Sequence, residues 1–123
     1  MEHTELLTKI LETVPSVRFV GMYDSNFEKI IDGVQNGIIP HLSRDEMQNS
    51  VRYDIRRWET YKMFQNQLGD TKYSMVRYDK AILLTFSLNA GEFLRISIEP
   101  TADYKSVIEK IQDLIIKNPV LTN

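Results

Sequence analysis

One stretch of the sequence, residues 81–88, constrains the fold more than any other. It reads Ala-Ile-Leu-Leu-Thr-Phe-Ser-Leu, an almost continuous apolar run between the turn segments Asp79-Lys80 and Asn89-Ala90-Gly91. A strand with one wet face alternates apolar and polar residues, whereas a strand covered on both faces is apolar nearly throughout. We therefore expect a β-sheet that carries helices on both of its faces.

Further strands are predicted on either side of this run. Residues 72–78 and 93–99 show the two-residue period of a strand, with Leu94, Ile96 and Ile98 on one face. Nearer the N-terminus, residues 17–23 alternate as in a strand. They lead into Asp24-Ser25-Asn26, whose side chains bond readily to nearby backbone and so favour a turn. This pattern predicts a hairpin over residues 17–31.

Three helices complete the expected elements. In the middle of the chain, Ser43 and Glu46 match a capping box at a helix start, and Gly69 suits a helix stop. The predicted helix over residues 43–68 would be about 39 Å long, at 1.5 Å per residue. Apolar residues at three- and four-residue spacing predict the two other helices, residues 4–14 and 102–117.

The resulting order is α-β-β-α-β-β-β-α. It predicts a single α/β (α+β) domain over residues 1–123, with a five-stranded antiparallel sheet and helices on both faces. A two-layer domain with all helices on one side is the rival architecture. The apolar run of residues 81–88 argues against that rival.

Composition excludes several kinds of chemistry. The chain has no cysteine, which excludes thiol catalysis, cysteine-based metal sites and disulfides. Its two histidines have no patterned partners, and glycine-rich phosphate loops are missing. We therefore expect no enzyme, no catalytic residue, no metal and no cofactor.

Charge and hydropathy bear on location and partners. The longest apolar stretch, residues 81–84, is far shorter than a membrane helix, so we expect a soluble, cytoplasmic protein with no membrane contact. Arg44, Arg52 and Arg56 are candidate anion contacts, although opposite-charge pairs such as Asp54–Arg57 favour a solvated face. The formal net charge of −2 disfavours nucleic acid as a partner.

The middle helix has two apolar stripes. The first, which contains Trp58, suits a sheet core, and a second is rotated by about a quarter turn. Either the helix curves around the sheet and both stripes are core, or the second stripe meets another chain. Aromatic residues with arginine are typical of interfaces. The candidate interface residues of this second stripe are Tyr53, Arg57, Tyr61 and Phe64.

The strand over residues 72–78 is polar for a central strand, and its charges suit a sheet edge. Such an edge can pair with its copy in a second chain, although flanking charges can also prevent that pairing. Tyr73, Met75 and Arg77 are therefore further candidate interface residues.

This order of elements resembles that of the roadblock/LC7 domain and its longin and profilin-like relatives. The resemblance covers the hairpin 17–31, the helix 43–68, the three strands over 72–99 and the last helix. It implies a non-enzymatic module that homodimerises through the middle helix and the following strand, and that binds a small GTPase or serves as a scaffold.

Two alternatives remain open at this point. One is a PAS- or profilin-like sensor of small molecules, with a pocket near Trp58 between the sheet and the long helix. The other, less favoured, is a nucleic-acid-binding module that uses Arg44, Arg52, Arg56 and Arg57.

Overall fold

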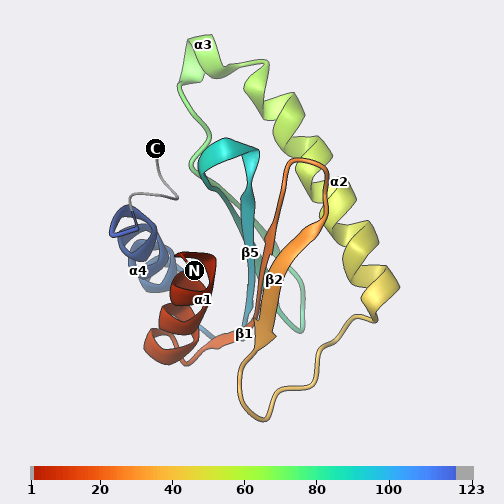
Figure 1. Cartoon of the computed structure of the whole chain (residues 1–123), viewed down its shortest axis with the longest axis vertical. Helices are drawn as coiled ribbons and strands as arrows, with labels where there is room; N and C mark the ends of the chain where they lie inside the picture. Colours follow the sequence, from red (N-terminus) through yellow and green to blue (C-terminus); the bar gives the residue numbers. More distant parts are fainter. Residues whose placement is uncertain (1, 119–123) are drawn as a thin grey trace.

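The computed structural model describes residues 2–118 and confirms the predicted fold. Five antiparallel strands form one sheet in the order β2-β1-β5-β4-β3. Helices α1 and α4 lie on one face of this sheet and α2 lies on the other (Figure 1). The elements are α1 (Glu2–Thr13), β1 (Val17–Tyr23), β2 (Lys29–Val34), α2 (Arg44–Lys62), α3 (Gln65–Leu68), β3 (Tyr73–Arg77), β4 (Ile82–Ser87), the 3₁₀ helix η1 (Asn89–Gly91), β5 (Phe93–Ile98) and α4 (Tyr104–Ile116).

The larger core lies between the sheet and the pair α1 and α4. Alternate residues of β4 and β5 enter it, and α1 adds Leu6 and Ile10 while α4 adds Ile111. All of these side chains are fully or almost fully buried. The strand residues are Ile82, Leu84, Phe86, Leu94, Ile96 and Ile98.

A second, smaller core lies on the opposite face. Val51, Ile55 and Trp58 of α2 pack there against Tyr23 and Phe93. The central strands thus carry helices on both sides, as the apolar run of residues 81–88 predicts, although Leu83 of that run is only half-buried.

The prediction of one continuous helix over residues 43–68 is wrong near its end, where Met63 and Phe64 interrupt it. Helix α2 ends at Lys62, which makes it 19 residues and about 28 Å long. Phe64 leaves helical geometry with φ −108° and ψ 11°, and its N–H donates to the Tyr61 carbonyl, one residue short of the α-helical partner. Few buried contacts hold these residues, so packing does not continue the helix there. Gly69 does end the chain's next helix, α3, with a φ of 85°.

The first hairpin also differs from its prediction. The return strand β2 covers Lys29–Val34 rather than residues 27–31, because Phe27 lies in the turn with a φ of 68°. Asp24 organises that turn by accepting bonds from the N–H groups of Asn26 and Glu28. Gly33, which lies beyond the predicted hairpin of residues 17–31, pairs with Val20 of β1 and leaves room for α1.

The capping box at the start of α2 is confirmed. The Ser43 hydroxyl accepts from the Glu46 N–H at 3.2 Å, and the Glu46 carboxylate accepts from the Ser43 N–H at 2.9 Å. These hydrogen bonds from Ser43 lower the pKa of Glu46 below its ordinary value. The first turn of α2 is therefore fixed locally, before any contact with the sheet.

The substitution Ser43→Ala should lower the free energy of unfolding by about 1 kcal/mol, because the Glu46 N–H loses its acceptor. Urea titration measures this loss, and Ser43→Asp, which keeps an acceptor, should retain most of the stability. The contribution of Glu46 is present above the ordinary pKa of glutamate and is lost as pH falls through the lowered value. The stability difference between the wild type and Glu46→Gln, which lacks the titrating group, should therefore shrink in acid, and an equal difference at all pH values would contradict this account.

Candidate functional site

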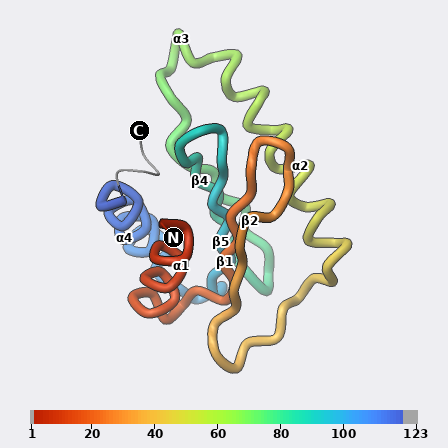
Figure 2. Tube along the Cα trace, in the orientation of Figure 1, coloured from red at the N-terminus to blue at the C-terminus, as the bar shows by residue number. Residues whose placement is uncertain are grey.

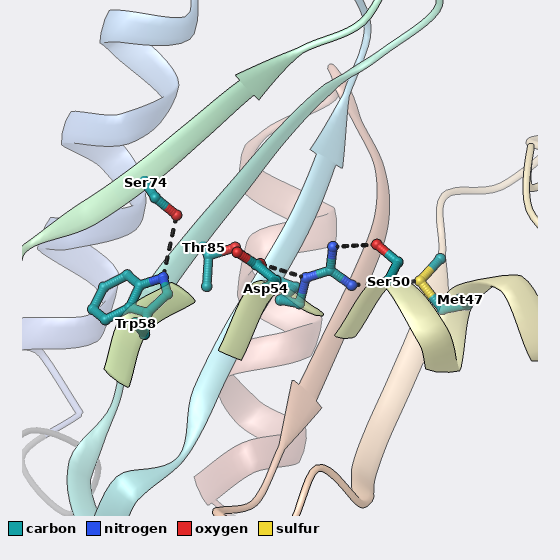
Figure 3. A network of polar contacts seen from close by, with 7 residues as sticks. Met47, Ser50, Asp54, Trp58, Ser74 and Thr85 are labelled. Carbon is teal, nitrogen blue, oxygen red and sulfur yellow. Dashed lines mark hydrogen bonds and ion pairs between the residues drawn. The ribbon is translucent and has the colours of Figure 1, made fainter. Parts of the chain in front are cut away.

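A cluster of buried polar side chains joins α2 to the sheet (Figure 3). The Asp54 carboxylate accepts from Arg95 Nε at 2.9 Å and from the Thr85 hydroxyl. The Arg95 guanidinium also donates to the Ser50 hydroxyl at 2.8 Å and contacts the Met47 sulfur. The ion pair thus joins α2 to β5, and the Thr85 hydroxyl of β4 bonds to the same Asp54 carboxylate.

This ion pair lies largely out of water. The Arg95 side chain is 7% exposed and that of Asp54 is 13% exposed. Removing two charges from water is costly, and the cost is offset only where geometry is good and the remaining polar atoms are bonded. The sequence pairs Asp54 with Arg57 on the helix surface, but Asp54 instead points to the sheet and binds Arg95.

The contacts of α2 move across the sheet as the chain advances. Ser50 reaches Arg95 of β5, Asp54 reaches Thr85 of β4, and Trp58 Nε1 donates to the Ser74 hydroxyl of β3 at 3.2 Å. The strand residues are neighbours in the ladder, since Ser74 pairs with Thr85 and Thr85 with Arg95. Helix α2 therefore lies over the cross-strand row Ser74–Thr85–Arg95–Gly21, and its apolar residues also reach the neighbouring pair Tyr23–Phe93.

Trp58 itself is a core residue. It is 3% exposed, and its ring meets Phe93 edge-on at a centroid distance of 5.4 Å. Tyr61 packs against it at 6.2 Å. The predicted ligand pocket at Trp58 is therefore occupied by protein side chains.

A cavity does exist on this face, one row away. The next row on the same face is Val76–Leu83–Ser97–Phe19, and α2 does not cover it. These four residues form the floor of a cavity of about 720 Å³. Its walls come from α2, including Tyr53 and Arg57, and from the loop that contains Pro40 and Leu42.

Charged groups surround this cavity, and several of them have partners. Arg18 pairs with Glu99 at 2.6 Å and donates to the Ile39 carbonyl at 3.1 Å. Arg95 is held by Asp54, while Arg57, Lys80 and His41 also line the space. No group of three or more potential metal ligands occurs among residues 2–118.

The predicted interface residues of α2 are mostly at the surface. Tyr53 is 67% exposed, Phe64 is 52% exposed, and Arg57 is also exposed. Tyr61 is intermediate, because one side of its ring lies against Trp58. The second apolar stripe is thus divided between core and surface.

The prediction that the strand over residues 72–78 lies at an edge of the sheet is confirmed. β3 is the last strand of the sheet and pairs with β4 alone among the described strands. Tyr73, Met75 and Arg77 are all exposed in part, with Tyr73 near Phe86 and Arg77 donating to the Pro100 carbonyl at 3.1 Å. The three candidate anion contacts, Arg44, Arg52 and Arg56, lie exposed on α2.

Comparisons with known proteins identify the fold. No family model matches the chain, and no curated protein matches it. A roadblock/LC7 domain structure from Streptomyces avermitilis superposes with a TM-score of 0.70 at 13% identity, over 92% of this chain and 91% of that one. The gliding protein MglB of Thermus thermophilus gives 0.68 at 10% identity, over 94% and 90%. An MglB structure with a tetrameric arrangement gives 0.67 at 11% identity, over 94% and 88%.

The chain therefore has the roadblock/LC7 fold, as the order of its elements indicates. At these identities the likeness shows the fold alone. Among the described residues, no helix is long and apolar enough to cross a membrane.

Breaking the buried ion pair on one side should be strongly destabilising. Asp54→Ala leaves Arg95 buried without its carboxylate, and we expect the free energy of unfolding to fall by about 3–5 kcal/mol. The double variant Asp54→Leu/Arg95→Met removes both charges and should be clearly more stable than Asp54→Ala. Denaturant titration of the two proteins measures the difference, and equal stability would show that the pair is not what ties α2 to the sheet.

Tyr23 gives a pH dependence with a definite sign. Burial raises its pKa from 10.0 to about 12, although the Arg95 guanidinium opposes the shift. The folded protein therefore keeps a proton that the unfolded chain releases, and the stability tied to Tyr23 should be lost as pH rises from 10 to 12. The stability difference between wild type and Tyr23→Phe should change over this interval, whereas Tyr78→Phe, at a residue 57% exposed, should follow the wild type.

Proposed function

We propose that this protein is a non-enzymatic, cytoplasmic interaction module that forms a homodimer. The observation that carries the proposal is the open edge of β3 beside the exposed residues of α2. An unpaired strand edge presents a row of N–H and C=O groups that a second strand can satisfy. The interface would include residues of α2 beside this edge: Tyr53, Arg57, Phe64 and part of Tyr61. On the edge strand itself it would include Tyr73, Met75 and Arg77.

The roadblock/LC7 fold supports this proposal, since an MglB structure with that fold has a tetrameric arrangement. The resemblance also names a class of partner. We propose that the dimer recruits another protein and acts as a scaffold, and that a small GTPase is the partner class to test first. Fold analogy alone supports the GTPase.

The cavity favours one alternative function. A concave space of about 720 Å³, with apolar surface and charged groups around it, is of the size that small ligands occupy. A small-molecule sensor would therefore use the row Val76–Leu83–Ser97–Phe19 rather than Trp58. Nucleic-acid binding through Arg44, Arg52 and Arg56 has less support, because the chain has a net charge of −2.

Light scattering on a sizing column tests the dimer. At tens of micromolar, the wild type should have twice the chain mass of 14.4 kDa. Met75→Lys should raise the dissociation constant at least tenfold, because pairing of β3 with its copy would bring two ammonium groups together. Met75 is 40% exposed, so the variant should still fold.

Ile116→Lys is the matched control, since Ile116 is 70% exposed and belongs to α4 rather than to β3 or α2. It should leave the dimer unchanged. A wild type that is monomeric at this concentration would overturn the proposal, as would a Met75→Lys protein that dimerises as tightly as the wild type.

A further inference from the structure

We propose that the cavity on the α2 face binds a small amphipathic carboxylate, that is, an acid with an apolar chain or ring attached to one carboxylate group. The carboxylate would bond to the Arg95 guanidinium, and the apolar body would lie over Val76 and Leu83 of the floor. This inference rests on the small-molecule alternative of the proposed function and gives the chemistry of its ligand. It does not depend on the proposed dimer.

The Arg95 guanidinium has hydrogen-bonding capacity that the protein leaves unused. Its Nε donates to Asp54 and its Nη2 donates to Ser50 at 2.8 Å. Among the described residues, its Nη1 contacts the Met47 sulfur at 3.8 Å and no oxygen atom (Figure 3). A guanidinium carries five N–H donors, whereas a thioether is only a weak acceptor. Because the Arg95 side chain is 7% exposed, a buried cation retains donors for one further acceptor.

A small recess gives an acceptor room beside this guanidinium. The recess has a volume of about 20 Å³, and apart from Ile96 its lining residues also line the cavity, so the two spaces adjoin. Arg95, Ser50 and Met47 are among the residues that they share. About 10–15 Å³ is enough for one water-sized group. The recess therefore has room for a carboxylate oxygen, while an apolar body has to lie in the larger cavity.

The larger cavity offers an apolar surface to such a body. Val76 and Leu83 belong to its floor and are half-buried, while Leu42 and Tyr53 belong to its walls. A volume of about 720 Å³ is within the range of small-ligand pockets. A chain or ring that lies on this floor removes apolar area from water on both sides, which favours binding. The cavity thus combines an apolar floor with one polar end.

The charges around the cavity favour a ligand with one negative charge over a polyanion. Arg95 is already paired with Asp54 at 2.9 Å, and Arg18 is paired with Glu99 at 2.6 Å. A phosphate dianion at Arg95 would lie near the Asp54 carboxylate and would be repelled by it. A carboxylate spreads a single charge over two coplanar oxygens, the geometry that a guanidinium binds well. We therefore assign the polar end of the cavity to a carboxylate.

Exposed residues at one end of the molecule give a ligand access to the cavity. Pro40 and His41, in the loop between β2 and α2, line the cavity and are exposed, as is Lys80 in the turn between β3 and β4. Figures 1 and 2 show that this loop runs from the end of β2 to the start of α2, at the end of the molecule away from α3. A ligand therefore reaches the floor without the unfolding of any helix or strand.

Isothermal titration calorimetry with octanoate and phenylbutyrate tests the inference. Each acid should bind saturably, with one molecule per chain. The neutral amides of the two acids should bind at least about tenfold more weakly, because they form no charge-assisted pair with Arg95. Acetate, which lacks the apolar body, should also bind at least about tenfold more weakly. Equal affinity of acid and amide would overturn the inference, as would the absence of saturable binding of either acid at about 1 mM.

A variant that fills the cavity tests its location. Ser97 is half-buried on the floor, two positions from Arg95 on β5, so Ser97→Leu should raise the dissociation constant of octanoate at least about tenfold. Ser87→Leu is the matched control, since Ser87 is exposed on β4 and does not line the cavity; it should bind as the wild type does. Val76→Phe repeats the test where Ser97→Leu does not fold by circular dichroism. Wild-type affinity in a folded filling variant would refute the assigned site.

Two further variants test which cation holds the carboxylate. Arg95→Lys keeps a positive charge beside Asp54 but removes Nη1, so octanoate should lose most of its advantage over octanamide. Arg57→Gln removes another cation of the cavity wall and should keep that advantage. If Arg57→Gln abolishes the preference for the acid, Arg95 is not the binding group and the inference fails, whether or not Arg95→Lys folds.

Light scattering on the same samples separates this inference from the proposed function. A dimeric protein that binds neither acid overturns the inference and leaves the dimer standing. A monomeric protein that binds both acids, with the expected preference over the amides, supports the inference and overturns the dimer.

Discussion

The ion pair between Asp54 and Arg95 is the contact on which the α2 face depends. It connects residues 41 positions apart and, with Ser50 and Thr85, fixes where α2 crosses the sheet. An apolar contact could slide by a turn with little loss, whereas a buried charge has one acceptable partner. Because the pair holds α2 on the row of Arg95, the next row, with Leu83 at its centre, stays open.

The two faces of the sheet are therefore built differently. Toward α1 and α4, β5 presents Leu94, Ile96 and Ile98, and the core there is closed. Toward α2 the same strand presents Phe93, Arg95 and Ser97, so its character changes from apolar to polar along its length. Packing alone seals the first face, while the second is half sealed and has surface left for association.

Much of this fold could be predicted from local signals. The two-residue period of the strands, the capping box at Ser43 and the doubly covered run of residues 81–88 each act over a few neighbours. The break at Phe64 could not, because no glycine or proline marks it and its cause is the loss of contact with the sheet. The cavity could not be predicted either, because it depends on the ion pair between Asp54 and Arg95. The sequence instead offers Arg57, three residues away, as the partner of Asp54. Only the alternation of Arg95 and Ser97 with apolar neighbours hints that this face differs.

The break at Phe64 and the open row are connected by the same geometry. A helix that continued straight from Lys62 would carry its apolar stripe farther from the sheet, with no residue of its own subunit to meet it. Where α2 ends and the chain turns into α3, Met63, Phe64 and Leu68 are all exposed. The row that Asp54 and Arg95 leave open has further apolar residues that α2 does not cover, Val76 and Leu83. The chain thus leaves apolar area exposed in two separate places, and the proposed two-fold association is an arrangement in which each contact is made twice, so that both subunits bury apolar area at once.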